Sequence, residues 1–210
     1  MNRTLRTALV LVAVGAVIGL AADRFVPRDV MPRDFPEYWA AGRLNLRGAN
    51  PYDPRQVLAE QRVAQPDRPA AVMMWNPPPS LALYMPLGLL GPRWAALGWV
   101  CVQLVAVFVA CDLLWRAYCP HRRWLGGVVG AASVGTWWMA GYGQNTGLLL
   151  LGLAGFLHFT RNEKPFAAGA CAALTALKPH LLAVFGVLLV ADAVTWGGRR
   201  ALAAGAGVVG

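Results

Sequence analysis

Long apolar runs, separated by short turns that are rich in arginine, dominate the sequence from about residue 80 onward. Hydrophobic residues make up 57% of the 210 residues, and charged residues only 14%. A soluble domain carries roughly a quarter charged residues, and one soluble core cannot absorb apolar runs of this length. The chain is therefore predicted to be an all-α, polytopic membrane helix bundle that forms a single membrane domain over residues 1–210.

The expected elements follow from these runs and from the residues that break them. A first span is expected over 7–22 and a long polar loop over 23–79, and the remainder, 80–210, is expected to hold further spans. Within it we predict a short interfacial helix at 80–90 and spans at 94–115, 124–140, 147–159, 165–177 and 181–196, with a last one beginning at 201.

The first and the last apolar run differ from a typical membrane span in their flanking residues or in their length. The first apolar run is preceded by two arginines, as in a signal peptide, but Leu20 is poorly suited to the third position before a cleavage site. We therefore interpret 7–22 as an uncleaved first helix. The last run, 201–210, is about half as long as a membrane crossing requires, so we interpret the bundle as truncated or as a fragment of a longer protein.

Basic residues are distributed unequally between the two sides that these spans define. The formal net charge is +9, whereas the loop 23–79 holds eight arginines and seven acids and is nearly neutral. With a cytosolic N-terminus, the cytosolic turns carry nine basic residues and the opposite short turns carry only Lys178. This asymmetry predicts a multi-pass protein of the plasma (inner) membrane whose loop 23–79 is external. It also explains the net charge without a nucleic-acid partner.

Neither a metal nor a cofactor is expected from the sequence motifs. None of the four cysteines forms a C-x-x-C pair, and the long loop contains no cysteine, which argues against structural zinc and against a disulfide-stapled loop. The sequence contains no Walker loop, no G-x-G-x-x-G after a strand, no H-E-x-x-H and no G-x-S-x-G.

The loop 23–79 is too aromatic for a plain disordered linker. Turn-forming residues are dense at 48–53, and helical spacing of larger side chains predicts short helices at about 36–48 and 56–65. Tryptophans lie mostly near the predicted span ends, and we interpret them, Trp99 included, as an interfacial aromatic belt.

Three polar segments are expected on the external side of the membrane, at 33–39, 143–145 and 178–180. Helices that end at the same depth bring their ends together, so a shared external cavity is predicted. Polar residues at breaks in membrane helices are candidates for function, because unsatisfied polar groups in lipid are expensive. The candidate substrate-binding residues are Glu37, Tyr38, Gln144, Asn145, Lys178 and His180.

Each of these candidates also has a purely structural interpretation. A carboxylate beside aromatic residues suits a general base, but Asp34 can instead cap the helix that begins near residue 36, with Glu37 completing a capping box. Lys178, with His180, suits a phosphate or pyrophosphate group, but a lysine there can also snorkel to the interface. Gln144 and Asn145 suit sugar hydroxyls or the backbone groups freed at the break.

The motifs resemble those of glycosyltransferase family 87 in their order along the chain. The resemblance rests on Asp34-Phe35-x-x-Tyr38-Trp39-x-Ala41-Gly42, Gly48-x-Asn50-Pro51-Tyr52-Asp53, Trp75-Asn76-Pro77-Pro78 leading to Pro86-Leu87, Gly143-Gln144-Asn145 and Leu177-Lys178-Pro179. It implies a GT-C type membrane enzyme that moves a hexose, typically mannose, from a polyprenyl-phosphate donor to a lipid or glycan acceptor on the external face. It also implies that Asp34 is the base and that Lys178 and His180 lie near the donor phosphate.

Two alternatives remain open at the level of sequence. Broken helices also line substrate paths in transporters and flippases, although no internal repeat is evident. A non-catalytic membrane assembly subunit is the other alternative, and it predicts that Asp34→Asn is tolerated.

Overall fold

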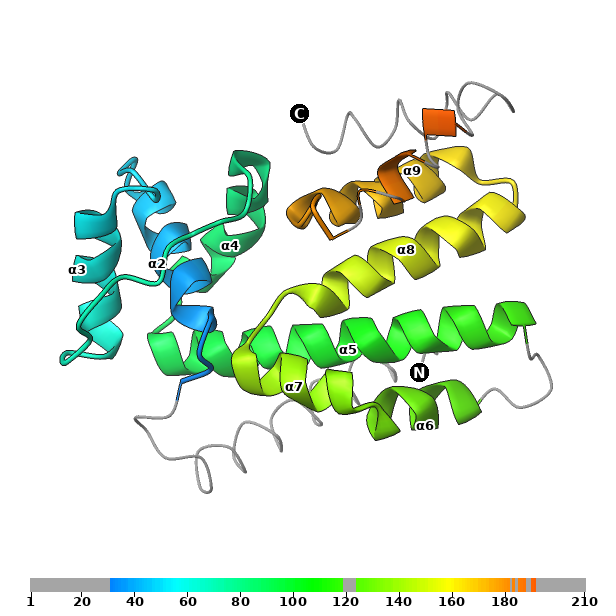
Figure 1. Cartoon of the computed structure of the whole chain (residues 1–210), viewed down its shortest axis with the longest axis horizontal. Coiled ribbons are helices and arrows are strands. Elements are labelled where there is room, and N and C mark those ends of the chain that lie inside the picture. The colour runs from blue at the N-terminus through cyan, green and yellow to red at the C-terminus, as the bar shows by residue number, and fades with distance from the viewer. Residues whose placement is uncertain (1–30, 119–123, 182, 184, 188–189, 192–210) are drawn as a thin grey trace, which may run out of the picture.

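The computed structural model describes residues 31–118, 124–181, 183, 185–187 and 190–191, and within these ranges it contains helices and no strand (Figure 1). This confirms the all-α prediction. The expected spans 7–22 and 201–210 lie outside the described residues, as does most of 181–196.

Two helices form in the polar loop, close to where they were predicted. α2 runs over Phe35–Leu46 and is followed by Gly48 at a φ of 68°, a conformation that glycine adopts without strain. α3 runs over Pro54–Ala64, and its N-cap Asp53 accepts a hydrogen bond of 2.8 Å from the backbone N–H of Arg55. Proline near each N-terminus suits the start of a helix, where its missing N–H costs nothing.

The apolar helices follow in chain order. A 3₁₀ turn, Pro78–Ser80, leads into α4 at Leu81–Gly88, and α5 occupies Pro92–Tyr118. α5 is long and apolar enough to cross a membrane, and it contains the expected span 94–115. Two shorter apolar segments lie within two residues of their predicted limits: α8, Thr146–Arg161, and α9, Pro165–Ala173, which continues as the 3₁₀ turn Leu174–Leu177.

The region predicted as one span at 124–140 consists of two helices, α6 at Trp124–Ala132 and α7 at Val134–Tyr142. The break is at Ser133, which is extended, with φ −68° and ψ 122°. Side chains of α7 satisfy carbonyls that the break exposes: Thr136 Oγ1 donates to Gly130 O at 2.7 Å and Trp137 Nε1 to Ala131 O at 2.7 Å. Hydropathy alone does not register this break, because both sides of it are apolar.

α5 is the central helix, packed between α8 and α6 (Figure 1). Glycines allow the backbones to approach closely: a Cβ on Gly126 of α6 would lie 2.9 Å from Cys111 O of α5. On the other side, a Cβ on Gly152 of α8 would lie 2.7 Å from Cys171 O of α9. Close approach through small residues is how helices associate in lipid, where the hydrophobic effect does not drive them together.

The tightest helix crossing joins α2 to α4, at the end of the molecule that also holds α3 (Figure 1). A Cβ on Gly42 would lie 2.2 Å from Tyr84 O, and one on Gly88 would lie 2.6 Å from Arg43 N. Each glycine therefore accommodates the backbone of the other helix, and the polar loop is fixed to the apolar part of the chain.

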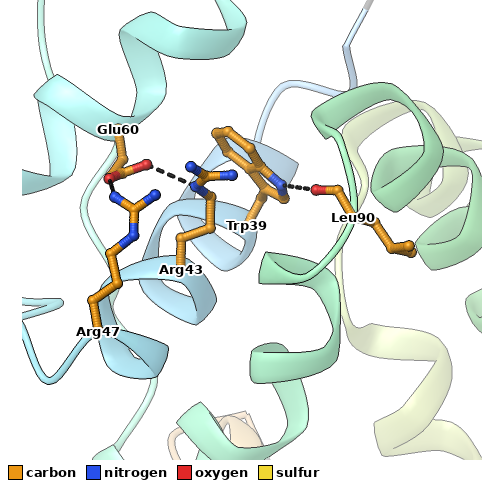
Figure 2. A network of polar contacts seen from close by, with 5 residues as sticks. All are labelled: Trp39, Arg43, Arg47, Glu60 and Leu90. Atoms are coloured by element: carbon orange, nitrogen blue, oxygen red, sulfur yellow. Dashed lines mark hydrogen bonds and ion pairs between the residues drawn. The ribbon is translucent and has the colours of Figure 1, made fainter.

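A polar network fixes α2 and α3 relative to the α4–α5 corner (Figure 2). Arg43 Nε donates to Glu60 Oε2 at 2.8 Å, and Arg47 pairs with the other carboxylate oxygen. The Arg43 guanidinium lies 4.9 Å from the ring centre of Trp39, whose Nε1 donates to Leu90 O at 3.0 Å. Trp39, a residue of the first motif, thus has a structural role here.

Candidate functional site

The segment that carries Asp34 lies directly on the turn between α7 and α8. The backbone N–H of Asp34 donates to Tyr142 O at 2.8 Å, and Gln144 Nε2 donates to Asp34 Oδ2 at 3.0 Å. Gly143, between these two partners, has a φ of 72°, and a Cβ there would lie 2.6 Å from Pro32 Cβ. Two of the three predicted polar segments therefore meet, although they are more than a hundred residues apart in the chain.

The capping interpretation of Asp34 is wrong. Asp34 occupies the N-cap position of α2, but its side chain makes no cap hydrogen bond. Pro36 has no N–H to offer at the second helical position, and the N–H of Glu37 donates to the backbone carbonyl of Asp34 at 3.2 Å instead. The Asp34 N–H is occupied by Tyr142, so the capping box with Glu37 does not form either. The carboxylate therefore remains available, with Gln144 as its described partner.

A second carboxylate, Glu37, lies one helical turn further along α2 and is almost fully buried, with 7% of its surface exposed. Burial raises the pKa of Glu37 to about 7; Tyr38 and Lys178 oppose this rise and Asp34 adds to it. The Tyr38 hydroxyl is close to Glu37 but makes no hydrogen bond of normal geometry with any described residue. Burial and then the Glu37 charge raise the pKa of Tyr38, so this hydroxyl keeps its proton.

The third polar segment contributes Lys178, which follows the 3₁₀ turn after α9. Burial lowers the pKa of Lys178, and the carboxylates of Glu37 and Asp34 oppose this. These mutual effects place one ammonium group near two carboxylates, a pattern typical of functional sites. His180, by contrast, is exposed, and no hydrogen bond or ion pair joins it to the other candidate residues.

Asn145 does not face a cavity that a sugar can reach. Its side chain is fully buried, and its Nδ2 donates to the Tyr84 hydroxyl at 2.9 Å. The structure therefore separates the two amides of the turn: Gln144 contacts the Asp34 carboxylate, whereas Asn145 contacts the protein interior.

Two residues of α5 hold this turn in place, and sequence reasoning missed both. Trp99 is 2% exposed and donates from Nε1 to Gly143 O at 2.8 Å, so its assignment to an interfacial belt is wrong. Gln103, one helical turn later, accepts at Oε1 from the backbone N–H of Leu148 at 3.2 Å. A glutamine inside an apolar span was the signal that could have identified this face of the helix.

An apolar groove of about 470 Å³ lies between the segment Pro77–Leu83 and the segment 173–179. Prolines, alanines and leucines line most of it, and Ser80 is the only polar residue among them. Lys178 lies between two residues of the groove wall, Leu177 and Pro179. The groove wall therefore includes both sequence neighbours of the lysine whose pKa the Glu37 and Asp34 carboxylates raise.

No described residues group three or more histidine, cysteine, aspartate or glutamate side chains where they could hold a metal ion. The arrangement instead offers a carboxylate for proton transfer, an ammonium group for an anion, and an apolar surface beside them.

The model of glycosyltransferase family 87 matches residues 75–210, well over half of the chain. This chain belongs to glycosyltransferase family 87. No curated protein and no solved structure matches the chain significantly.

Membership of family 87 confirms the resemblance and makes the chain a membrane glycosyltransferase by family. α5 is a candidate span, whereas the multi-pass topology and the external orientation of the loop stay predictions. The match begins at Trp75, so the role of Asp34 depends on the geometry described above.

Proposed function

We propose that this family 87 protein transfers a hexose, mannose in the first instance, from a polyprenyl-phosphate donor to a hydroxyl of a lipid or glycan acceptor on the external face, by a GT-C type mechanism. The observation that carries the proposal is the Asp34 carboxylate, which is free of capping, is held by Gln144 and raises the pKa of Lys178, whose two sequence neighbours line an apolar groove.

In the proposed reaction Asp34 accepts the proton of the acceptor hydroxyl. The acceptor oxygen forms a bond to the anomeric carbon while the bond from that carbon to the phosphate oxygen breaks, and the anomeric configuration inverts. The electron pair of the broken bond leaves with the polyprenyl phosphate. The amide of Gln144 orients the carboxylate, and a general base of this kind contributes about 10²–10⁴-fold to a rate.

The donor class is supported by the groove and by its position next to Lys178. An isoprenoid chain is apolar and suits a groove lined by proline, alanine and leucine. The ammonium group of Lys178 is a compact positive charge that suits the phosphate of the donor and of the leaving group. Glu37 and Tyr38 are also proposed to contact substrate, on whose binding these buried side chains would have to become accessible. The exposed His180 is proposed to reach the phosphate only when donor is bound.

The experiment that tests this proposal measures transfer of labelled mannose from polyprenyl-phosphate-mannose in membranes containing the protein. Asp34→Asn keeps the size of the side chain and its contact with Gln144 but removes the basic oxygen, so we expect a loss of about 10²–10⁴-fold. Asp53→Asn is the matched control, because it makes the same chemical change at the N-cap of α3, where asparagine caps as well as aspartate.

The outcomes separate the parts of the proposal. Loss of activity in Asp34→Asn but not in Asp53→Asn, at equal protein levels, supports Asp34 as the base. Full activity in Asp34→Asn would remove Asp34 from the mechanism and make Glu37 the next residue to substitute. If wild-type membranes transfer no sugar from any polyprenyl-phosphate donor, the proposed donor is wrong.

A further inference from the structure

Tyr84, in the middle of α4, is buried and has none of its side chain exposed. Its ring stacks on Tyr38 with centroids 4.7 Å apart and meets Trp99 edge to face at 5.6 Å. Its backbone carbonyl lies where a Cβ of Gly42 would be, at the tight α2–α4 crossing. The position of this side chain is thus set by contacts with two other helices, α2 and α5.

The Tyr84 hydroxyl joins two asparagines that are far apart in sequence. Asn76 Nδ2 donates to it at 2.6 Å and Asn145 Nδ2 at 2.9 Å, and both asparagines are buried. The Oδ1 of Asn145 has no hydrogen-bond partner among the described residues. Half a turn of that amide would present Oδ1 to the phenol instead, so the contact survives either orientation.

Each asparagine belongs to one half of the proposed site. Asn145 directly follows Gln144, the partner of Asp34, and Asn76 directly precedes Pro77, where the wall of the apolar groove begins. No backbone hydrogen bond connects these two segments among the described residues. The hydroxyl of Tyr84 is therefore a short polar link between the wall of the groove and the turn that orients the base.

We propose that Tyr84 is a positioning residue of the transferase, and that its hydroxyl fixes the Gln144–Asn145 turn relative to the groove wall through Asn145 and Asn76. The inference rests on the proposed function, because it takes Asp34 as the base and the groove as the donor site. Tyr84 itself touches neither reacting group. It acts by keeping Gln144, and through it the carboxylate, in one place relative to the donor.

The test compares Tyr84→Phe with Tyr52→Phe. Both changes remove one phenol oxygen from the same region, because Tyr52 donates from its hydroxyl to the backbone carbonyl of Asn76 at 2.9 Å. Only Tyr84 reaches the turn. We expect Tyr84→Phe to lower kcat at least about tenfold per folded molecule, whereas Tyr52→Phe keeps kcat within about twofold and changes only the KM for the donor.

A second measurement does not depend on activity. Hydrogen exchange of the backbone amides at 143–148 should be faster in Tyr84→Phe and in Asn145→Ala than in the wild type, and unchanged in Tyr52→Phe. The double variant Tyr84→Phe/Asn145→Ala should exchange no faster than either single variant, because the two side chains act as one unit.

The failures of the two proposals are distinguishable. Wild-type kcat together with unchanged exchange at 143–148 in Tyr84→Phe would overturn the positioning role while leaving Asp34 and the donor intact. An active Asp34→Asn variant would overturn the proposed base, whatever Tyr84→Phe does. Equal effects of Tyr84→Phe and Tyr52→Phe on kcat and on exchange would show that loss of any phenol in this region loosens the fold, and would also overturn the inference.

Discussion

The buried carboxylate of Glu37 makes the stability of the protein depend on pH in a direction that can be predicted. Burial raises its pKa from an ordinary value of 4.5 to about 7 in the folded protein. Between these two values the folded state binds more protons than the unfolded state. Stability contributed by the protonated carboxyl is therefore fully present below pH 4.5 and is lost as pH rises through 7.

The size of the effect follows from the shift. Each pKa unit corresponds to about 1.36 kcal/mol, so the shift of Glu37 costs about 3 kcal/mol of stability at pH 8 relative to the protonated form. Glu37→Gln retains the shape of the side chain and cannot ionise. We expect this variant to be more stable than the wild type by about 2–3 kcal/mol at pH 8 and by less than about 1 kcal/mol at pH 5.

The assay is chemical unfolding in detergent micelles, followed by tryptophan fluorescence, at intervals between pH 5 and pH 8. The quantity compared is the difference in unfolding free energy between Glu37→Gln and the wild type, because this difference cancels most contributions from other titrating groups. Glu163→Gln is the matched control, since Glu163 is exposed. A difference that stays flat from pH 5 to pH 8, or that favours the wild type at pH 8, would refute the reasoning.

Three further predictions concern two glycines at close backbone contacts and the partly buried ion pairs of Glu60. Gly42→Ala should destabilise the protein by about 1–3 kcal/mol, because its Cβ would clash with a backbone carbonyl of α4. Gly98 has open space around it, so Gly98→Ala should be neutral or slightly stabilising in the same unfolding assay. Gly143→Ala should lower transferase activity at least about tenfold, because the added Cβ would displace the segment that carries Asp34. Gly48 has a similar left-handed backbone conformation but open space around it, so Gly48→Ala should lower only the stability, by about 1 kcal/mol. Glu60→Gln should lower the unfolding free energy by about 1–3 kcal/mol because it leaves Arg43 of α2 and Arg47, which follows α2, without their carboxylate. A loss that disappears in moderate salt would show that these ion pairs are screened surface contacts.

Local and compositional features were predictable because they depend on residues that are close together in the chain. Both short helices of the loop have a proline in their first two positions, α3 is capped by Asp53, and the longest apolar run became α5. The motif order was enough to suggest glycosyltransferase family 87, which the family match confirms for residues 75–210. These properties depend on hydropathy, turn chemistry and motif order, all of which are written in the sequence itself.

The tertiary structure decided which polar groups meet. Asp34 stands where a cap is expected, yet Pro36 removes a donor and Gln144 supplies a partner 110 residues away. Asn145 and Gln144 are neighbours with similar side chains, and only the packing of α4 and α5 directs one inward and the other to the carboxylate. Trp99 is of a residue type that is common in interfacial belts, but its indole N–H donates to the backbone carbonyl of Gly143 inside the protein. Side-chain partners of this kind depend on how helices cross, and the crossings are set by close backbone contacts that sequence periodicity does not record.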